Sequence, residues 1–169
     1  MRTKPDYRCR GKSMSLNEKQ GDVLNKMAAN EEMIGRLYQA YARQFPQYKG
    51  LWSDLANEEA KHASSVRELT YRTEDGSLVF NTDRFNAAAI QTFSTYLAGE
   101  TASAQKQETP LINAINITLY IEESLIENKY FEVFKSDAAE LKRLLENLGS
   151  DTKNHADRVR AVRNKIRSR

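Results

Sequence analysis

Apolar side chains recur three and four residues apart along five long stretches of this 169-residue chain. This spacing is typical of α-helices that bury one face in a protein core. Only three prolines and seven glycines are present, so few positions interrupt such helices. A capping-box spacing at residues 15–18, and Thr109 followed by Pro110, mark two helix starts. We therefore predict helices over residues 15–45, 52–69, 83–103, 109–134 and 137–166.

The third predicted helix contains no acid or histidine on its apolar face, so we interpret it as a packing element. The residues expected to be buried on that face are Phe85, Ala89, Phe93, Tyr96 and Leu97. The segment before it, residues 70–81, is predicted to be a loop with a short extended piece at residues 77–80.

Four of the predicted helices carry carboxylates or the only two histidines inside their apolar stripes. The first contains Glu31, the second Glu59 and His62, the fourth Glu122 and the fifth His155. A carboxylate buried among apolar side chains is costly unless a cation or strong hydrogen-bond donors compensate its charge. We therefore predict that these five side chains form a metal site. The alternative is a buried hydrogen-bonded network without metal.

The order of the helices favours one architecture. Four of them form two antiparallel pairs, and the third lies in the connection between the pairs, where a long crossover is needed. The predicted fold is therefore all-α: a ferritin-like four-helix bundle with an extra helix in the long crossover between core helices two and three. Ligand sites in such bundles combine carboxylate oxygens with imidazole nitrogens, which suit iron or manganese, with zinc as a common occupant.

Residues 15–166 resemble the rubrerythrin-type branch of the ferritin-like superfamily. Glu31 has Tyr38 seven residues later, and Glu59 stands three residues before His62, as is typical of the family. The segments that carry the resemblance are EEMIGRLY at 31–38, LANEEAKH at 55–62, IEESLIE at 121–127 and the region around His155.

The resemblance implies an iron cofactor, a di-iron centre in which manganese or zinc are alternative occupants. Glu31 would be a terminal ligand, Glu59 a bridging ligand and His62 a terminal imidazole, while Glu122 and His155 would hold the second metal. It implies no catalytic residue beyond these ligands. The implied activity is oxidoreductase or peroxidase chemistry on peroxide or oxygen, with a separate electron-donor protein and a homodimeric assembly.

One departure from the family pattern leaves open whether the protein is an enzyme. Thr152 stands three residues before His155, where the pattern has Glu, so one bridging carboxylate is lost. The second metal is therefore expected to bind more weakly. Asp151 and Glu123 are candidates to fill the gap, and Glu122 is preferred to Glu123 only by its place in the stripe. The alternative function is a non-catalytic metal-binding or structural module.

Composition argues against several other classes of protein. Cys9 is the only cysteine, so a rubredoxin-like segment with CxxC pairs is not expected and electrons must come from another protein. Residues 1–14 are predicted to be a flexible basic leader and residues 15–169 the helical domain. No apolar block follows this leader, and no run approaches the ~18 residues of a membrane span, so a cytoplasmic location without membrane contact is expected. The net charge of +3 and the basic residues 158–169, which we interpret as a solvated helix end, do not favour a nucleic-acid partner.

Overall fold

The computed structural model describes residues 18–74, 79–80, 87–127, 134–135 and 139–168. Within these ranges the chain is almost entirely helical, with one short pairing of two-residue strands. The elements in chain order are α1 (Glu18–Gln44), η1 (Pro46–Tyr48), α2 (Lys49–Glu74), β1 (Val79–Phe80), α3 (Ala87–Gln105), α4 (Leu111–Glu127), β2 (Phe134–Lys135) and α5 (Ala139–Arg167).

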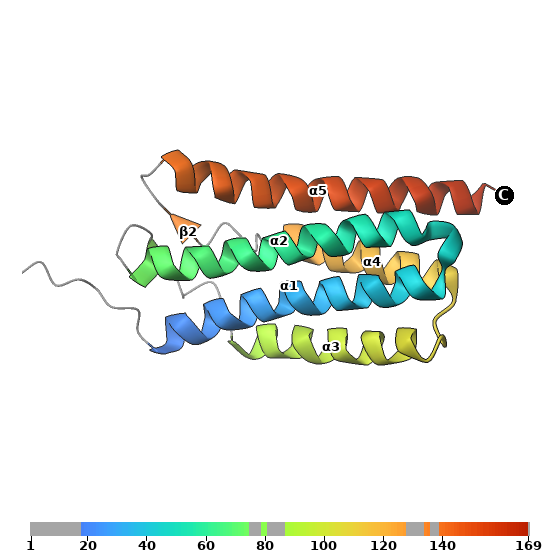
Figure 1. The fold of residues 1–169 in the computed structure, drawn as a ribbon, viewed down its shortest axis with the longest axis horizontal. Helices are drawn as coiled ribbons and strands as arrows, with labels where there is room; N and C mark the ends of the chain where they lie inside the picture. The colour runs from blue at the N-terminus through green and yellow to red at the C-terminus, as the bar shows by residue number, and fades with distance from the viewer. Residues whose placement is uncertain (1–17, 75–78, 81–86, 128–133, 136–138, 169) are drawn as a thin grey trace, which may run out of the picture.

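The turn between α1 and α2 is set by a proline. Phe45, the residue before Pro46, has φ −123° and ψ 76°, which lies outside the helical region, as expected for a residue that precedes proline. The single 3-10 turn η1 follows, in which the backbone N–H of Tyr48 donates to the carbonyl of Phe45 at 2.9 Å. Because α2 begins at the next residue, α1 and α2 pack antiparallel side by side (Figure 1).

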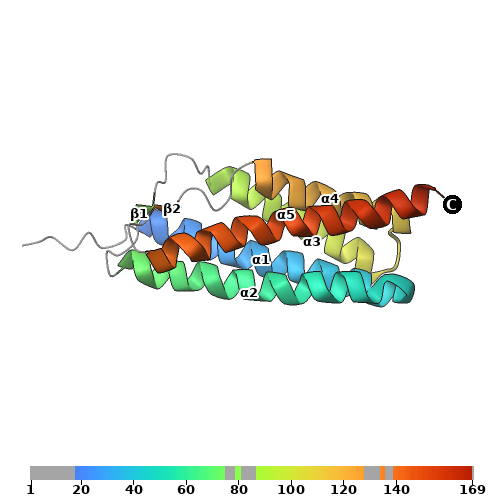
Figure 2. The same ribbon diagram turned by 90° about the horizontal axis from the view of Figure 1, so that it is seen from above.

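Four helices form the bundle, and α3 lies outside it. Figure 1 shows α5 and α1 on opposite sides of the bundle, and the view from above in Figure 2 shows α2 and α4 on the other two sides. The helix α3 packs along the outside of α1. The connection from α2 to α4 therefore contains an extra helix, and the chain has the all-α ferritin-like arrangement that the sequence predicts.

Three details of the secondary-structure predictions were wrong. Residues 70–74 were predicted to be loop, but they are the last residues of α2, which ends at Glu74. Ala89 is exposed, and Ile90, which the prediction did not include, is buried on the face of α3 that turns toward α1. The predicted burial of Leu97 is confirmed. On the same face the hydroxyl of Ser94 donates to Oδ1 of Asn30 in α1 at 2.5 Å. Residues 87–89 are all alanine, so the sequence there does not distinguish a buried face from an exposed face, which explains the error at Ala89. Phe93 and Tyr96 are half-buried, and Phe85 lies outside the described residues.

The third error concerns the end of α4, which was predicted to continue to Phe134. In the described part of the chain α4 ends at Glu127, and Phe134 instead pairs with Phe80 in the antiparallel strands β1 and β2. This pairing joins segments far apart in the sequence, so no local periodicity could indicate it. The extended conformation expected at residues 77–80 is confirmed for Val79 and Phe80. Tyr130, placed by prediction in the same helix, lies outside the described residues.

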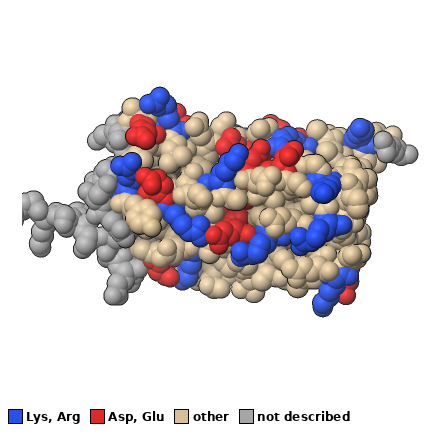
Figure 3. Space-filling view, in the orientation of Figure 1, with Lys and Arg blue, Asp and Glu red and all other residues tan. Residues whose placement is uncertain are grey.

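The surface carries both signs of charge. On the face shown in Figure 3, lysine and arginine side chains alternate with aspartate and glutamate, and neither sign forms a continuous patch. Ion pairs also join adjacent helices, such as that between Arg67 of α2 and Glu32 of α1. None of the helices in the described part of the chain is both long and apolar enough to span a bilayer.

Candidate metal centre

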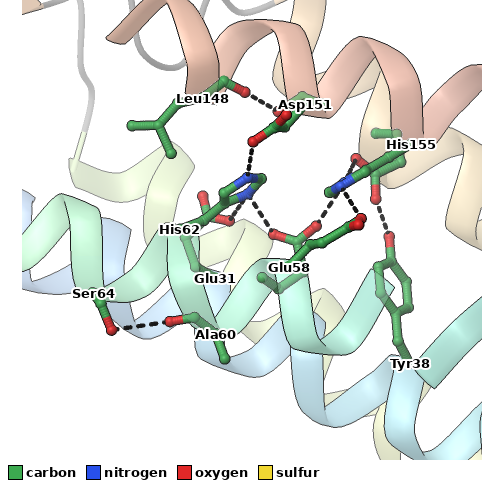
Figure 4. Close-up of polar contacts among 12 residues, drawn as sticks. Glu31, Tyr38, Glu58, Ala60, His62, Ser64, Leu148, Asp151 and His155 are labelled. Carbon is green, nitrogen blue, oxygen red and sulfur yellow. Dashed lines mark hydrogen bonds and ion pairs between the residues drawn. The ribbon is translucent and has the colours of Figure 1, made fainter. Parts of the chain in front are cut away.

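The structure brings together all five side chains that the sequence indicates. Glu31 comes from α1, Glu59 and His62 from α2, Glu122 from α4 and His155 from α5. Each is at most 3% exposed. Figure 4 shows the two imidazoles side by side between α2 and α5, with ring centroids 5.4 Å apart. Helical spacing places each of the five residues on the core face of its helix, so the five side chains converge when the bundle folds.

Glu59 lies at the centre of the cluster, with one oxygen near each histidine. Its Oε2 atom is 3.1 Å from Nδ1 of His62, and its Oε1 atom is 2.9 Å from Nδ1 of His155. Around it are two groups whose ligand atoms all lie within 4.8 Å of one another: Glu31, Glu59 and His62, and Glu59, Glu122 and His155. The arrangement therefore has two adjacent places for a cation that share one carboxylate.

Burial makes two carboxylates of the cluster, Glu31 and Glu122, difficult to ionise. Burial, followed by repulsion from Glu59 and Glu122, raises the pKa of Glu31 well above its ordinary value. Burial and the charge of Glu59 likewise raise the pKa of Glu122, although its contacts with His155 and Tyr38 oppose the shift. Burial also raises the pKa of Glu59, but hydrogen bonds from His155 and His62 outweigh it and lower that pKa to about 2.

The carboxylates of the cluster favour the charged form of both imidazoles. Burial lowers the pKa of His155, but its contacts with Glu122 and Glu59 outweigh burial and raise the pKa to about 10. The pKa of His62 is raised by Glu59 in the same way, against the opposing effects of burial and the neighbouring imidazole. Without metal, protons on the histidines thus supply part of the positive charge that the cluster needs.

The residues present fit a pair of divalent metal ions. Neither carboxylate oxygen of Glu31 accepts a hydrogen bond from the residues that the structure describes, although the side chain is fully buried. A buried acceptor without a donor is destabilising, and a bound cation would satisfy it. Three carboxylates and two imidazoles are ligands that suit iron, manganese or zinc. The assignment of the five as metal ligands remains a prediction that the geometry supports.

A carboxylate also lies at the outer nitrogen of each histidine, as the dashed lines in Figure 4 show. Oδ2 of Asp151 in α5 is 3.5 Å from Nε2 of His62 in α2, and Oε2 of Glu58 in α2 is 2.8 Å from Nε2 of His155 in α5. Arg158 donates to the same oxygen of Glu58 at 2.7 Å. Such carboxylates fix the tautomer and orientation of a ligating imidazole.

The sequence analysis missed Glu58 and considered Asp151 only as a metal ligand. Asp151 belongs to neither group of three, and its side chain is 56% exposed. Both residues stand four positions before a histidine, so each lies one turn away on the same side of its helix. This repeated spacing was a signal that could have been used. The partner of each acid, however, is the histidine of the other helix.

The remaining candidates have other contacts. Glu123 accepts a hydrogen bond from Arg160 at 2.8 Å at the surface, whereas Glu122 accepts one from the phenol of Tyr38 at 2.6 Å in the core. Thr152 is buried, and its hydroxyl donates to the carbonyl of Leu148 at 3.0 Å. Neither Glu123 nor Thr152 therefore supplies charge to the cluster in this structure.

Comparison with known proteins agrees with the resemblance to rubrerythrins that the sequence shows. The family model of rubrerythrin matches residues 22–163. The matched range contains the whole cluster, so the chain belongs to the rubrerythrin family. Searches of curated proteins and of solved structures found no match.

Proposed function

We propose that this protein binds two metal ions, iron in its active form, and uses them to reduce peroxide or oxygen. The observation that carries the proposal is the position of Glu59, whose two oxygens each approach a different histidine. Di-iron bundles place a Glu-x-x-His pair on each of two helices, so that carboxylates lie between two imidazole-bearing halves, and Glu59 keeps one of these two carboxylates. Membership in the rubrerythrin family supports the same chemistry.

The side chains around the cluster have separate roles in this proposal. Bound iron would supply the electrons that reduce the oxidant. The phenol of Tyr38 donates a hydrogen bond to Oε1 of Glu122 and so orients that carboxylate. Burial and the charges of Glu122 and Glu59 raise the pKa of Tyr38, which keeps the phenol protonated. Glu58 and Asp151 hold the outer nitrogens of the two imidazoles, so that the inner nitrogens face the shared carboxylate.

Metal binding is tested by a matched pair of neighbouring acids. Glu122→Ala and Glu123→Ala remove the same atoms from adjacent residues of α4, but only Glu122 lies in the cluster. We expect protein purified without chelators to carry metal, Glu122→Ala to lose most of it, and Glu123→Ala to keep it. The double change Glu59→Ala with His62→Ala should abolish binding. Equal metal content in all the variants, measured by elemental analysis, would place the site elsewhere.

Redox activity requires a second experiment. The protein is loaded anaerobically with ferrous iron, peroxide is added, and the absorption of the iron is followed against free ferrous iron at the same concentration. Oxidation faster than that of free iron, and slowed by Glu122→Ala but not by Glu123→Ala, supports the proposal. Oxidation no faster than that of free iron would reject the redox function.

The second candidate function is metal binding without catalysis. It is favoured by Thr152, which is buried beside the cluster and supplies no carboxylate there. With three carboxylates rather than four, two divalent ions would leave a positive charge in the core, which lowers affinity for the pair. Stable metal content combined with no reaction with peroxide would support this alternative.

The proposed partners follow from the same chemistry. The sequence has one cysteine, so we propose that electrons come from a separate protein. We also propose a homodimer in the cytoplasm, on the resemblance to rubrerythrins. Light scattering of the purified protein measures the assembly, and a monomeric mass across the micromolar range would contradict the dimer.

A further inference from the structure

Four aromatic side chains pack together where α1 turns into α2. The ring centroid of Trp52 lies 5.3 Å from that of Tyr41, 5.4 Å from that of Phe45 and 6.3 Å from that of Tyr48. Trp52 and Tyr41 are fully buried, whereas Tyr48 is half-buried in the turn η1. This group, the Trp52 cluster, therefore connects the core with the surface.

The Trp52 cluster and the candidate metal centre share the helix α2. Trp52 and Glu59 are seven residues apart on that helix, which is two turns and about 10 Å along its axis. Both side chains are buried on the core face of the helix. Trp52 is also the only tryptophan of the chain.

We propose that Trp52 and Tyr48 form a one-electron path between the candidate metal centre and the surface at the α1–α2 turn. The path rests on the proposed redox function, because it has a role only if the centre accepts electrons. It assigns the turn as the place where a reductant delivers them.

The hydrogen bonds decide which rings give up electrons. Nε1 of Trp52 donates to Oγ1 of Thr118 at 3.1 Å, and that hydroxyl donates to the carbonyl of Ala114, so no base is placed to take the indole proton. Trp52 therefore loses an electron while keeping its proton. The buried hydroxyl of Tyr41 has no hydrogen-bond partner among the described residues, so it has no acceptor for the proton that an oxidised phenol must release. Tyr48 is half-buried in the turn, and its hydroxyl is not among the buried polar atoms without a partner, so an oxidised Tyr48 can release its proton to water.

Reduction of one peroxide to two waters takes two electrons and two protons, and each electron follows the same steps. Peroxide bound at the iron-loaded centre would be the oxidant that takes one electron from the Trp52 indole, which becomes a radical cation. Tyr48 then returns an electron to Trp52 and releases its O–H proton to water, which leaves a neutral tyrosyl radical. A one-electron reductant at the surface, together with a proton from water, restores the phenol. A second pass supplies the second electron.

The path is tested without iron, so that the result does not depend on the proposed function. The full chain is loaded with zinc, which has no redox chemistry. An ultraviolet pulse selective for the single tryptophan removes an electron from Trp52, and transient absorption follows the tryptophan and tyrosine radicals. Tyr48→Phe removes the proposed donor, and Tyr41→Phe is the matched control, because it removes the hydroxyl of the other tyrosine that packs on Trp52.

We expect the tryptophan radical to decay as a tyrosyl radical appears, in the original protein and in Tyr41→Phe alike. In Tyr48→Phe the tyrosyl product should be lost, and the tryptophan radical should live at least tenfold longer. An unchanged decay in Tyr48→Phe, or loss of the tyrosyl radical in Tyr41→Phe, would overturn the path. The ferrous iron and peroxide experiment described above decides the redox function separately.

Discussion

At the scale of single residues, each histidine of the candidate metal centre has carboxylates at both of its ring nitrogens. The inner nitrogen of His155 faces Glu59 and Glu122, and its outer nitrogen faces Glu58. The carboxylate of Glu58 restricts rotation of the ring. It also accepts a hydrogen bond from the N–H group that a ligating imidazole must carry on its other nitrogen. Glu58 would therefore act on a bound metal through His155.

Glu58→Gln tests this positioning role. We expect metal affinity to fall about 10-fold or more, because an amide holds the imidazole proton more weakly than a carboxylate does. Glu123→Gln is the control, since Glu123 also accepts a hydrogen bond from an arginine of α5 but contacts no histidine in the described structure. Competition with a metal indicator gives both affinities. Equal affinities would show that Glu58 has no part in metal binding.

Thr152→Glu introduces the carboxylate that the family pattern has three residues before His155. Without metal, a further buried carboxylate should lower the melting temperature, because nothing compensates its charge. With metal, the same variant should bind the pair more tightly than the original protein does. Thr152→Gln adds similar volume without charge and should not raise affinity. Weaker metal binding by Thr152→Glu would indicate that a carboxylate cannot reach the cluster from position 152.

At the scale of helices, two glycines differ in how much space surrounds them. Gly149 lies within α5, and an added Cβ atom there would contact nothing within 4 Å. At Gly35 in α1, by contrast, an added Cβ would lie 3.4 Å from the carbonyl oxygen of Ala56 and 3.5 Å from Cβ of Glu59. Gly35 therefore allows α1 to lie close to α2 directly beside the shared carboxylate.

Gly149→Ala should stabilise the protein by about 0.5–1 kcal/mol, because alanine restricts the unfolded chain and fits the helix without contact. Chemical denaturation measures the change in the free energy of unfolding. A loss of stability would mean that position 149 needs a backbone conformation that alanine cannot adopt.

Gly35→Leu should have the opposite effect. A side chain larger than a methyl group must push α1 away from α2, at a cost of about 1–3 kcal/mol. Because Glu59 is the residue beside it, metal content should fall together with stability. Full metal content in a destabilised Gly35→Leu would show that the separation of α1 and α2 does not control the cluster.

At the scale of the whole molecule, protons would compete with metal ions for one buried cluster of carboxylates and imidazoles. The pKa of His155 is raised from 6.5 to about 10, and those of His62, Glu31 and Glu122 are raised as well. A group whose pKa is raised by folding binds more protons in the native state, so its stabilising effect is lost as pH rises. For His155 that effect is complete below pH 6.5 and disappears toward pH 10.

We therefore expect the melting temperature of metal-free protein to fall between pH 7 and pH 10. Metal-loaded protein should show a much flatter profile over the same range, because the metal replaces the protons. Thermal unfolding with and without a chelator gives the two curves. A metal-free melting temperature that rises over this interval would contradict the assignment of raised pKa values to the cluster.

The sequence by itself determined the five helices of the fold and the five side chains that meet in the core. Helical periodicity is a local property, so an acid or a histidine in an apolar stripe is directed inward whatever its neighbours are. The stripe position of Glu122 separated it from Glu123 for the same reason.

The tertiary structure decided the contacts that join different helices. Glu58 of α2 contacts His155 of α5, and Asp151 of α5 contacts His62 of α2, because these two helices lie next to each other in a fixed register. The pairing of Phe80 with Phe134 depends in the same way on segments distant in the sequence. Sequence periodicity gives the direction of a side chain from its own helix, but only packing sets which side chain of another helix it meets.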